Sequence, residues 1–85
     1  MAKITKAEMP ALAEQIVKCL GGKENVARIN HCATRLRVNP VDMEKVDKDG
    51  LKRLHGVIGI DSSKAELQII VGAIIEDLYL EVEKI

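Results

Sequence analysis

VARINHCATRLRVN, residues 26–39, is the stretch that decides the fold. Residues 26–30 and 35–39 are predicted to be two short strands, and in the second of them polar and aliphatic residues alternate. A connection as short as the one between them makes the two strands antiparallel neighbours. Cys32 is then expected to be exposed at the tip of a hairpin, where a partner protein can reach it.

The second predicted strand has two faces of different chemistry. Arg35 and Arg37 are two positions apart, so they leave the same face about 6.6 Å from each other. The opposite face of the strand then carries Thr34, Leu36 and Val38. One face of this strand is therefore expected to be cationic and the other to face an apolar core.

Cys32 is the candidate nucleophile. A cysteine near its reference pKa is only a few per cent thiolate at neutral pH, and the thiolate is the reactive form. A preference of roughly 2 kcal/mol for the charged form would make the thiol about half ionised. The guanidinium groups of Arg35 and Arg37 are close enough in sequence to supply that preference.

The same loop carries donors for an anion. Guanidinium groups match the geometry of phosphate oxygens, and the hydroxyl of Thr34 is a further donor. The backbone N–H groups of a tight loop, here those of Ala33 and Leu36, complete the candidate phosphate-binding site. A nucleophilic sulfur beside an oxyanion site suits the transient capture of a phosphoryl group.

Other interpretations stay open on the residues alone. A cysteine at a strand end is often a small buried residue, and alternating arginines are often a solvated strand face. A cysteine phosphatase needs an arginine six positions after its cysteine, and that position holds Val38. The main alternative function is a non-catalytic regulatory domain that docks a protein through the exposed loop of Cys32.

His31 precedes the cysteine and has two interpretations. It can bias the ionisation of the thiol or touch the phosphate, or it can shape the loop and contact a partner protein. Neighbours on an extended chain point apart, which favours the second interpretation. We therefore expect His31 to be a partner-contact residue.

Composition excludes several classes of function. The 85 residues suffice for one domain with a modest core, which must be aliphatic because the chain has no Trp, no Phe and one Tyr. Acidic and basic residues balance at 13 each, and side chains for base stacking are almost absent, so no nucleic-acid partner is expected. The longest apolar runs fall far short of a membrane span, and the start of the chain turns polar at once, so we expect neither membrane insertion nor secretion.

Neither a disulfide nor a metal is expected. Without a secretion signal, an even number of cysteines is weak support for pairing Cys19 with Cys32. These cysteines, with His31 and His55, lack the close paired spacings of zinc ligands, and no Mg²⁺ motif is present. The sequence therefore predicts no metal and no cofactor.

The residues before the hairpin predict an amphipathic helix. Thr5 and Glu8 have the spacing of a capping box, and Gly21-Gly22 predicts the end of the helix. Pro10 removes a helical hydrogen bond, so the regular helix is expected to begin later than the box suggests. Cys19 falls on the apolar stripe, where we expect it to pack in the core.

The rest of the chain predicts a short helix within residues 47–54, strands at 57–61 and 66–71, and a last helix from Ile74 to Ile85. This order predicts an α+β fold, an open-faced sandwich in which a four-stranded, mainly antiparallel sheet carries three helices on one side. The other side of the sheet would carry the two arginines.

Residues 30–37 resemble a known family. A cysteine, any residue and then Thr-Arg-Leu-Arg is similar to the phosphocysteine loop of the enzyme IIB domain in the sugar phosphotransferase system driven by phosphoenolpyruvate. His31 before the cysteine is similar to the sucrose, β-glucoside and N-acetylmuramate branch. Residues 51–59 (LKRLHGVIG) and 67–72 (LQIIVG) resemble further segments of that family, so the resemblance covers nearly the whole chain.

The resemblance implies the same fold and a phosphoryl-transfer activity. It implies that Cys32 accepts a phosphoryl group from a phosphohistidine on a IIA domain and passes it to a sugar presented by a membrane IIC domain. Arg35 and Arg37 would clamp the phosphoryl oxygens, with Thr34 and the loop amides as donors. The expected partners are therefore a IIA domain and a IIC domain.

The resemblance also implies a place in a larger protein. Residues 1–85 would form one phosphotransferase IIB domain, a segment of a longer IIBC or IIABC permease at the cytoplasmic face of the cell membrane. The chain stops inside its last predicted helix without a C-terminal cap, which suggests the same.

Overall fold

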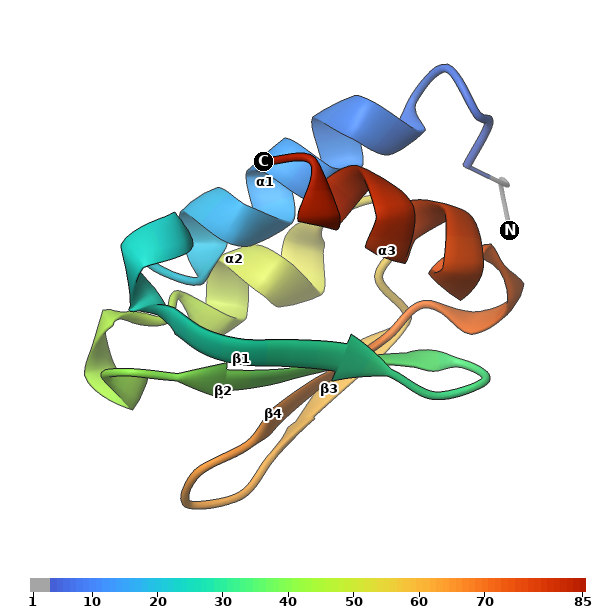
Figure 1. Ribbon diagram of the computed structural model, residues 1–85. Helices are drawn as coiled ribbons and strands as arrows, with labels where there is room; N and C mark the ends of the chain where they lie inside the picture. The colour runs from blue at the N-terminus through green and yellow to red at the C-terminus, as the bar shows by residue number, and fades with distance from the viewer. Residues whose placement is uncertain (1–3) are drawn as a thin grey trace.

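The computed structural model describes residues 4–85 (Figure 1); residues 1–3, part of the polar start of the chain, lie outside the described residues. The elements follow in the order α1 (Met9–Cys19), β1 (Val26–His31), β2 (Arg35–Pro40), α2 (Lys48–Arg53), β3 (Gly59–Ser62), β4 (Leu67–Ile70) and α3 (Ile75–Glu83), with short 3-10 turns at Lys23–Asn25, Met43–Lys45 and Gly72–Ile74.

The four strands form one sheet in the order β1-β2-β4-β3, and every neighbouring pair is antiparallel. The three helices cover one side of this sheet and leave the other side open (Figure 1). The predicted open-faced sandwich is confirmed. The third strand begins later than predicted because Gly56, at φ +104°, and the bond from the N–H of Val57 to the carbonyl of Leu54 place a turn before it.

Alternation along β2 sets the two faces of the sheet. Leu36 and Val38 are completely buried beneath the helices, whereas Arg37 is exposed and Arg35 is partly buried on the open side. Each fully buried aliphatic side chain contributes roughly 1.5–3 kcal/mol relative to an exposed one, so a one-residue slip of this strand would be costly. The completely buried side chains are Ala13, Ile16, Leu20, Leu36, Val38, Leu51, Leu67, Ile69 and Leu78.

The start of α1 differs in detail from a capping box. The carboxylate of Glu8 accepts hydrogen bonds from the backbone N–H of Thr5 at 3.1 Å and from its hydroxyl at 3.0 Å, so the hydroxyl donates instead of accepting. The helix begins at Met9, after these two residues, and Pro10 falls in its first turn. The expected late start is confirmed.

Asn25 connects the turn after α1 to the end of the first hairpin. Its side chain is 4% exposed, and its Nδ2 donates to the carbonyls of Leu20 at 2.7 Å and Asp42 at 2.9 Å. Its Oδ1 accepts from the N–H of Asp42 at 2.9 Å. A buried amide that satisfies three backbone groups fixes where β1 leaves the helical layer.

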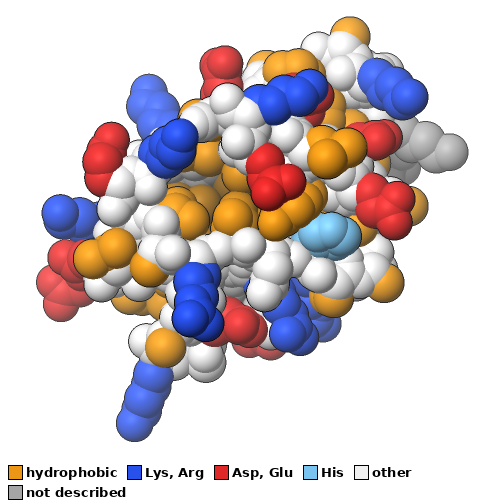
Figure 2. Space-filling model, in the orientation of Figure 1, with side chains coloured by type: hydrophobic (Ala, Val, Ile, Leu, Met, Phe, Trp, Pro, Cys, Tyr) orange, Lys and Arg blue, Asp and Glu red, His pale blue; other side chains and the backbone are white. Residues whose placement is uncertain are grey.

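On the face shown in Figure 2, acidic and basic side chains are interspersed, and neither charge forms a patch of its own. This agrees with the formal net charge of zero. Apolar side chains are visible between the helices α1 and α3 and strand β1. Within residues 4–85, none of the helices is both long and apolar enough to cross a bilayer.

Candidate functional site

The loop of Cys32, Ala33 and Thr34 closes the hairpin between β1 and β2. The N–H of Cys32 donates to the carbonyl of Arg35 at 3.0 Å, which continues the strand pairing up to the cysteine. The carbonyl of Thr34 accepts from the N–H groups of both Val71 and Gly72, each at 3.0 Å. The loop is therefore anchored to the chain that leaves β4 and enters α3.

Cys32 lies at the end of the hairpin as expected, but it is less exposed than the sequence predicted. The residue is partly buried, because the loop is tied to the neighbouring segment instead of extending into solvent. Its thiol is free and is not paired with Cys19. The thiol is therefore partly shielded but keeps some exposure to solvent.

The loop favours the thiolate of Cys32. The backbone N–H of Thr34 is the main cause that lowers the pKa of this thiol, and the N–H of Arg35 acts in the same direction. The charge of Arg37 and then that of Arg35 lower the pKa further, while partial burial opposes these effects. The sequence predicted this effect from the two arginines, but the amide of Thr34 contributes more than either of them.

Cys19 is also a partly buried free thiol, but its surroundings act on its pKa in the opposite direction. It is partly buried against the core at the end of α1, less deeply than its place on the apolar stripe predicted, and its carbonyl accepts a hydrogen bond from the N–H of Asp47 at 2.7 Å, just before α2. Burial and the charge of Asp47 raise the pKa of its thiol. Cys19 is therefore a packing residue and a natural internal control.

The two arginines share the open side of the sheet but have different surroundings. Nη1 of Arg35 donates to Oε1 of Gln68 at 2.6 Å and lies 3.8 Å from Oδ2 of Asp61. Within residues 4–85, the guanidinium of Arg37 has no hydrogen bond or ion pair. One arginine is therefore held by the protein, and the other is available to an incoming anion.

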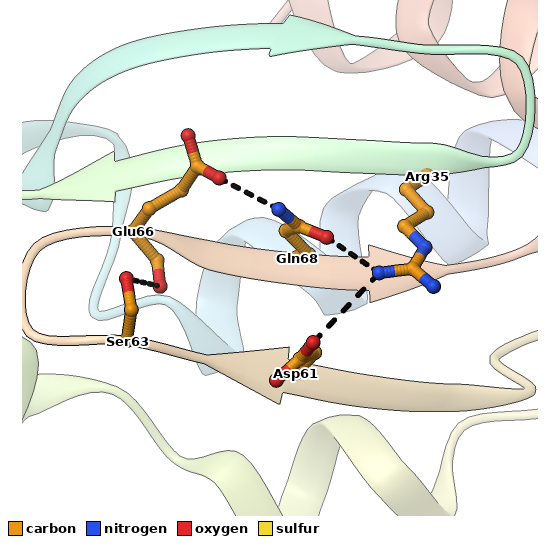
Figure 3. A network of polar contacts seen from close by, with 5 residues as sticks. All are labelled: Arg35, Asp61, Ser63, Glu66 and Gln68. Carbon is orange, nitrogen blue, oxygen red and sulfur yellow. Dashed lines mark hydrogen bonds and ion pairs between the residues drawn. The ribbon is translucent and has the colours of Figure 1, made fainter.

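Asp61, Glu66 and Gln68 are the residues that the sequence did not assign to the site (Figure 3). Nε2 of Gln68 donates to Oε1 of Glu66 at 2.7 Å, so a chain of contacts runs from this carboxylate through the amide to Arg35. Because these polar residues alternate with apolar ones, the sequence could have assigned them to the open side of the sheet. It could not have indicated that β4 lies beside β2 and that β3 lies beside β4.

His31 shapes the loop. Its ring lies 4.5 Å from the ring of Tyr79 on α3, at an angle of 53°, and its Nδ1 lies 3.0 Å from the carbonyl oxygen of Cys32. The imidazole is thus directed to the helical side of the sheet and toward the loop backbone. A contact of His31 with a partner protein stays a prediction.

Comparisons with known proteins identify the family. A family model described as "phosphotransferase system, EIIB" matches residues 14–47. A crystal structure of one domain of the PTS system, the IIabc component from Clostridium difficile, superposes with a TM-score of 0.88 at 32% identity, over 96% of this chain and 86% of that one. The chain belongs to the EIIB family of the phosphotransferase system.

Curated relatives are similar to this EIIB chain over most of its length. The sucrose-specific EIIBC component of Vibrio alginolyticus is 39% identical over 77 residues, which is 89% of the chain. The β-glucoside-specific EIIBCA component of Bacillus subtilis is 43% identical over 68 residues, or 80% of the chain. The chain spans only 16% and 11% of the length of these two proteins.

The remaining predicted residues of the EIIB site lie in or next to the loop. Ala33 and Thr34 are exposed, and Leu36 lies in β2 with its side chain completely buried, so only its backbone is available to an anion. The amides that act on the thiol are those of Thr34 and Arg35, and phosphate binding by Ala33 and Leu36 stays a prediction. Within residues 4–85, no group of three or more His, Cys, Asp or Glu side chains gathers in a metal-binding arrangement.

Proposed function

We propose that this EIIB chain is a phosphoryl carrier and that Cys32 is its acceptor. The phosphoryl group comes from a phosphohistidine of a IIA domain and leaves to the hydroxyl of a sugar bound by a IIC membrane domain. The observation that carries this proposal is the loop itself, in which backbone N–H groups and the charges of Arg35 and Arg37 favour a thiolate at a partly open position.

The two transfers balance as nucleophilic displacements at phosphorus. In the first, the Cys32 thiolate attacks, an S–P bond forms, the P–N bond breaks, and the imidazole nitrogen keeps the electron pair and takes up a proton. In the second, a sugar hydroxyl attacks, an O–P bond forms, the S–P bond breaks, and the sulfur leaves as a thiolate while the hydroxyl proton is lost. Both transition states spread negative charge over the equatorial oxygens, where arginines stabilise it.

The partners and the location belong to the same proposal. The names of the relatives, EIIBC and EIIBCA, combine this unit with C and A units in one polypeptide. We infer that the chain works as the IIB unit of a longer sugar permease, IIBC or IIABC, at the cytoplasmic face of the cell membrane. Thr34 and the amides of Ala33 and Leu36 would donate hydrogen bonds to the phosphoryl oxygens, and His31 would contact the partner.

The intact mass of the chain tests the proposal. The domain is incubated with phosphoenolpyruvate, enzyme I, HPr and a IIA domain, with Cys32→Ser and Cys19→Ser in parallel. We expect the wild type and Cys19→Ser to gain one phosphoryl group, Cys32→Ser to gain none, and the gain to disappear when a IIC domain and its sugar are added.

Two results would contradict this function. Full labelling of Cys32→Ser would remove the phosphocysteine assignment. A wild-type chain that gains no mass with several IIA partners, while its fold is intact by circular dichroism, would favour the alternative of a docking domain that transfers nothing.

A further inference from the structure

Arg35 is held by residues from two other strands. Its guanidinium extends from β2 across β4 toward β3, where Gln68 and Asp61 meet it (Figure 3). Both contacts involve the same nitrogen, Nη1. The guanidinium of Arg35 is therefore held through Nη1.

Gln68 is the stronger of these two partners. Its contact with Arg35 is a hydrogen bond of 2.6 Å between partly buried groups. The carboxylate of Asp61 lies 3.8 Å away and is 70% exposed, so solvent and salt screen that attraction. The orientation of Arg35 depends mainly on the amide.

Glu66 fixes which end of the Gln68 amide faces Arg35. A carboxylate only accepts hydrogen bonds, so the amide nitrogen must point to Glu66, 2.7 Å away. The amide oxygen is then directed to the guanidinium, which only donates. Glu66 and Gln68 thus act as one unit with a single favourable orientation.

The register of the sheet shows that Gln68 accepts its hydrogen bond from an arginine other than the one directly opposite it. Gln68 lies directly opposite Arg37 in the pairing of β2 with β4, whereas Arg35 lies opposite Ile70. The amide nevertheless reaches diagonally to Arg35, within the range that a long side chain can span. Arg37, its direct neighbour, therefore provides a matched control.

The contact leaves one edge of the guanidinium open. Nε and Nη2 donate no hydrogen bond within residues 4–85, because only Nη1 is engaged. These two nitrogens form the planar fork that binds two phosphate oxygens at once. An arginine already fixed through its third nitrogen loses less rotamer freedom when an anion arrives.

We propose that Gln68, oriented by Glu66, is a positioning residue that holds Arg35 by Nη1 with its Nε and Nη2 edge free for the phosphoryl group on Cys32. This role rests on the proposed phosphoryl transfer. Gln68 acts through Arg35 and does not itself touch the phosphoryl oxygens.

A ³¹P NMR titration of the phosphorylated chain tests this role. The second ionisation of a protein phosphoryl group has a pKa of about 6, and a guanidinium fork favours the dianion and so lowers the titration midpoint. We expect Gln68→Leu to raise the midpoint by roughly half a pH unit relative to wild type, because Arg35 loses its fixed orientation. Circular dichroism verifies that each variant is folded.

Double variants show whether Gln68 acts through Arg35. We expect Gln68→Leu to add nothing to Arg35→Lys, which already lacks the fork, and to add its full effect to Arg37→Lys. Glu66→Gln should give part of the effect of Gln68→Leu, because its amide no longer fixes the orientation of Gln68. Where a variant is incompletely phosphorylated, the single and double variants are compared by their rates of phosphoryl uptake from the IIA domain instead of their titration midpoints.

The outcomes separate this inference from the proposed function. If Gln68→Leu adds equally to both arginine variants, or shifts neither the midpoint nor the rate, the positioning role is wrong while phosphoryl transfer stands. A wild-type chain that never gains a phosphoryl group overturns the proposed function and the positioning role with it.

Discussion

The ring of His31, at the end of β1, lies 4.5 Å from the ring of Tyr79 on α3, and the two planes are inclined by 53°. Tyr79 is the single Tyr in a chain that has no Trp and no Phe. Its hydroxyl also lies 3.4 Å from the carbonyl of Ile29, to which it donates. The last helix is thereby joined to the strand that leads into the Cys32 loop.

This ring pair should be measurable as a coupling energy. We expect Tyr79→Leu and His31→Ala to destabilise the fold, and their double variant to reveal a coupling of about 0.5–1 kcal/mol, which is typical of aromatic pairs. Urea unfolding gives the free energies. Tyr79→Phe keeps the ring and should keep most of the coupling; if it loses as much as Tyr79→Leu, the hydroxyl and not the ring makes the connection.

The two thiols should react over different pH ranges. The pKa of Cys32 is lowered, chiefly by the N–H of Thr34, and that of Cys19 is raised, chiefly by burial. Since the thiolate is the reactive form, Cys32 should be alkylated rapidly near neutral pH while Cys19 stays slow until more alkaline pH. The pH dependence of iodoacetamide labelling of Cys19→Ser and Cys32→Ser measures each thiol alone. Equal midpoints would contradict this prediction.

Substitutions around the loop should change the pH midpoint of Cys32 in a defined order. Arg37→Gln should raise it more than Arg35→Gln, because the charge of Arg37 has the larger effect on this thiol. Thr34→Ala should leave it almost unchanged, because the donor is the backbone N–H, which alanine retains. Both arginine effects should shrink in high salt. The same labelling experiment, in the Cys19→Ser background, tests the order, and a larger effect of Arg35→Gln would reverse it.

The contact between Thr5 and Glu8, just before α1, should make stability depend on pH. The backbone N–H of Thr5, followed by its hydroxyl, lowers the pKa of Glu8 in the fold. A group with a lowered pKa contributes stability above its unfolded pKa and loses it as the pH falls through the folded value. We expect the difference in Tm between wild type and Glu8→Gln to be present at neutral pH and to vanish in acid. A constant difference across this range would show that the charge of Glu8 is irrelevant.

Loss of the buried amide should destabilise the fold without changing the thiol. Asn25→Ala leaves the backbone groups of Leu20 and Asp42 without their partner, which costs about 2–3 kcal/mol. Urea unfolding should show this cost, and labelling of Cys32 should be unchanged because Asn25 lies at the other end of β1. Lys23→Ala, on the same turn, is the exposed control, and an equal loss in both variants would contradict the role of the buried amide.

The sequence by itself determined the elements and the faces of the sheet. Arg35 and Arg37 alternate with Leu36 and Val38, and a strand with this pattern can bury only one of its faces. The 3.6-residue spacing of apolar residues determined the helices in the same way, and a chain with almost no aromatic residues had to build an aliphatic core. The motif around Cys32 was also sufficient to indicate the family.

Only the tertiary structure decided which distant residues meet at the site. Gln68 is 33 positions from Arg35, and their contact exists because β4 lies between β2 and β3 in a particular register. Asn25 likewise binds Asp42 across 17 positions. Periodicity along a chain reports which face a residue occupies but carries no information on strand order. The neighbours across the sheet are chosen when all layers pack together, and they orient Arg35.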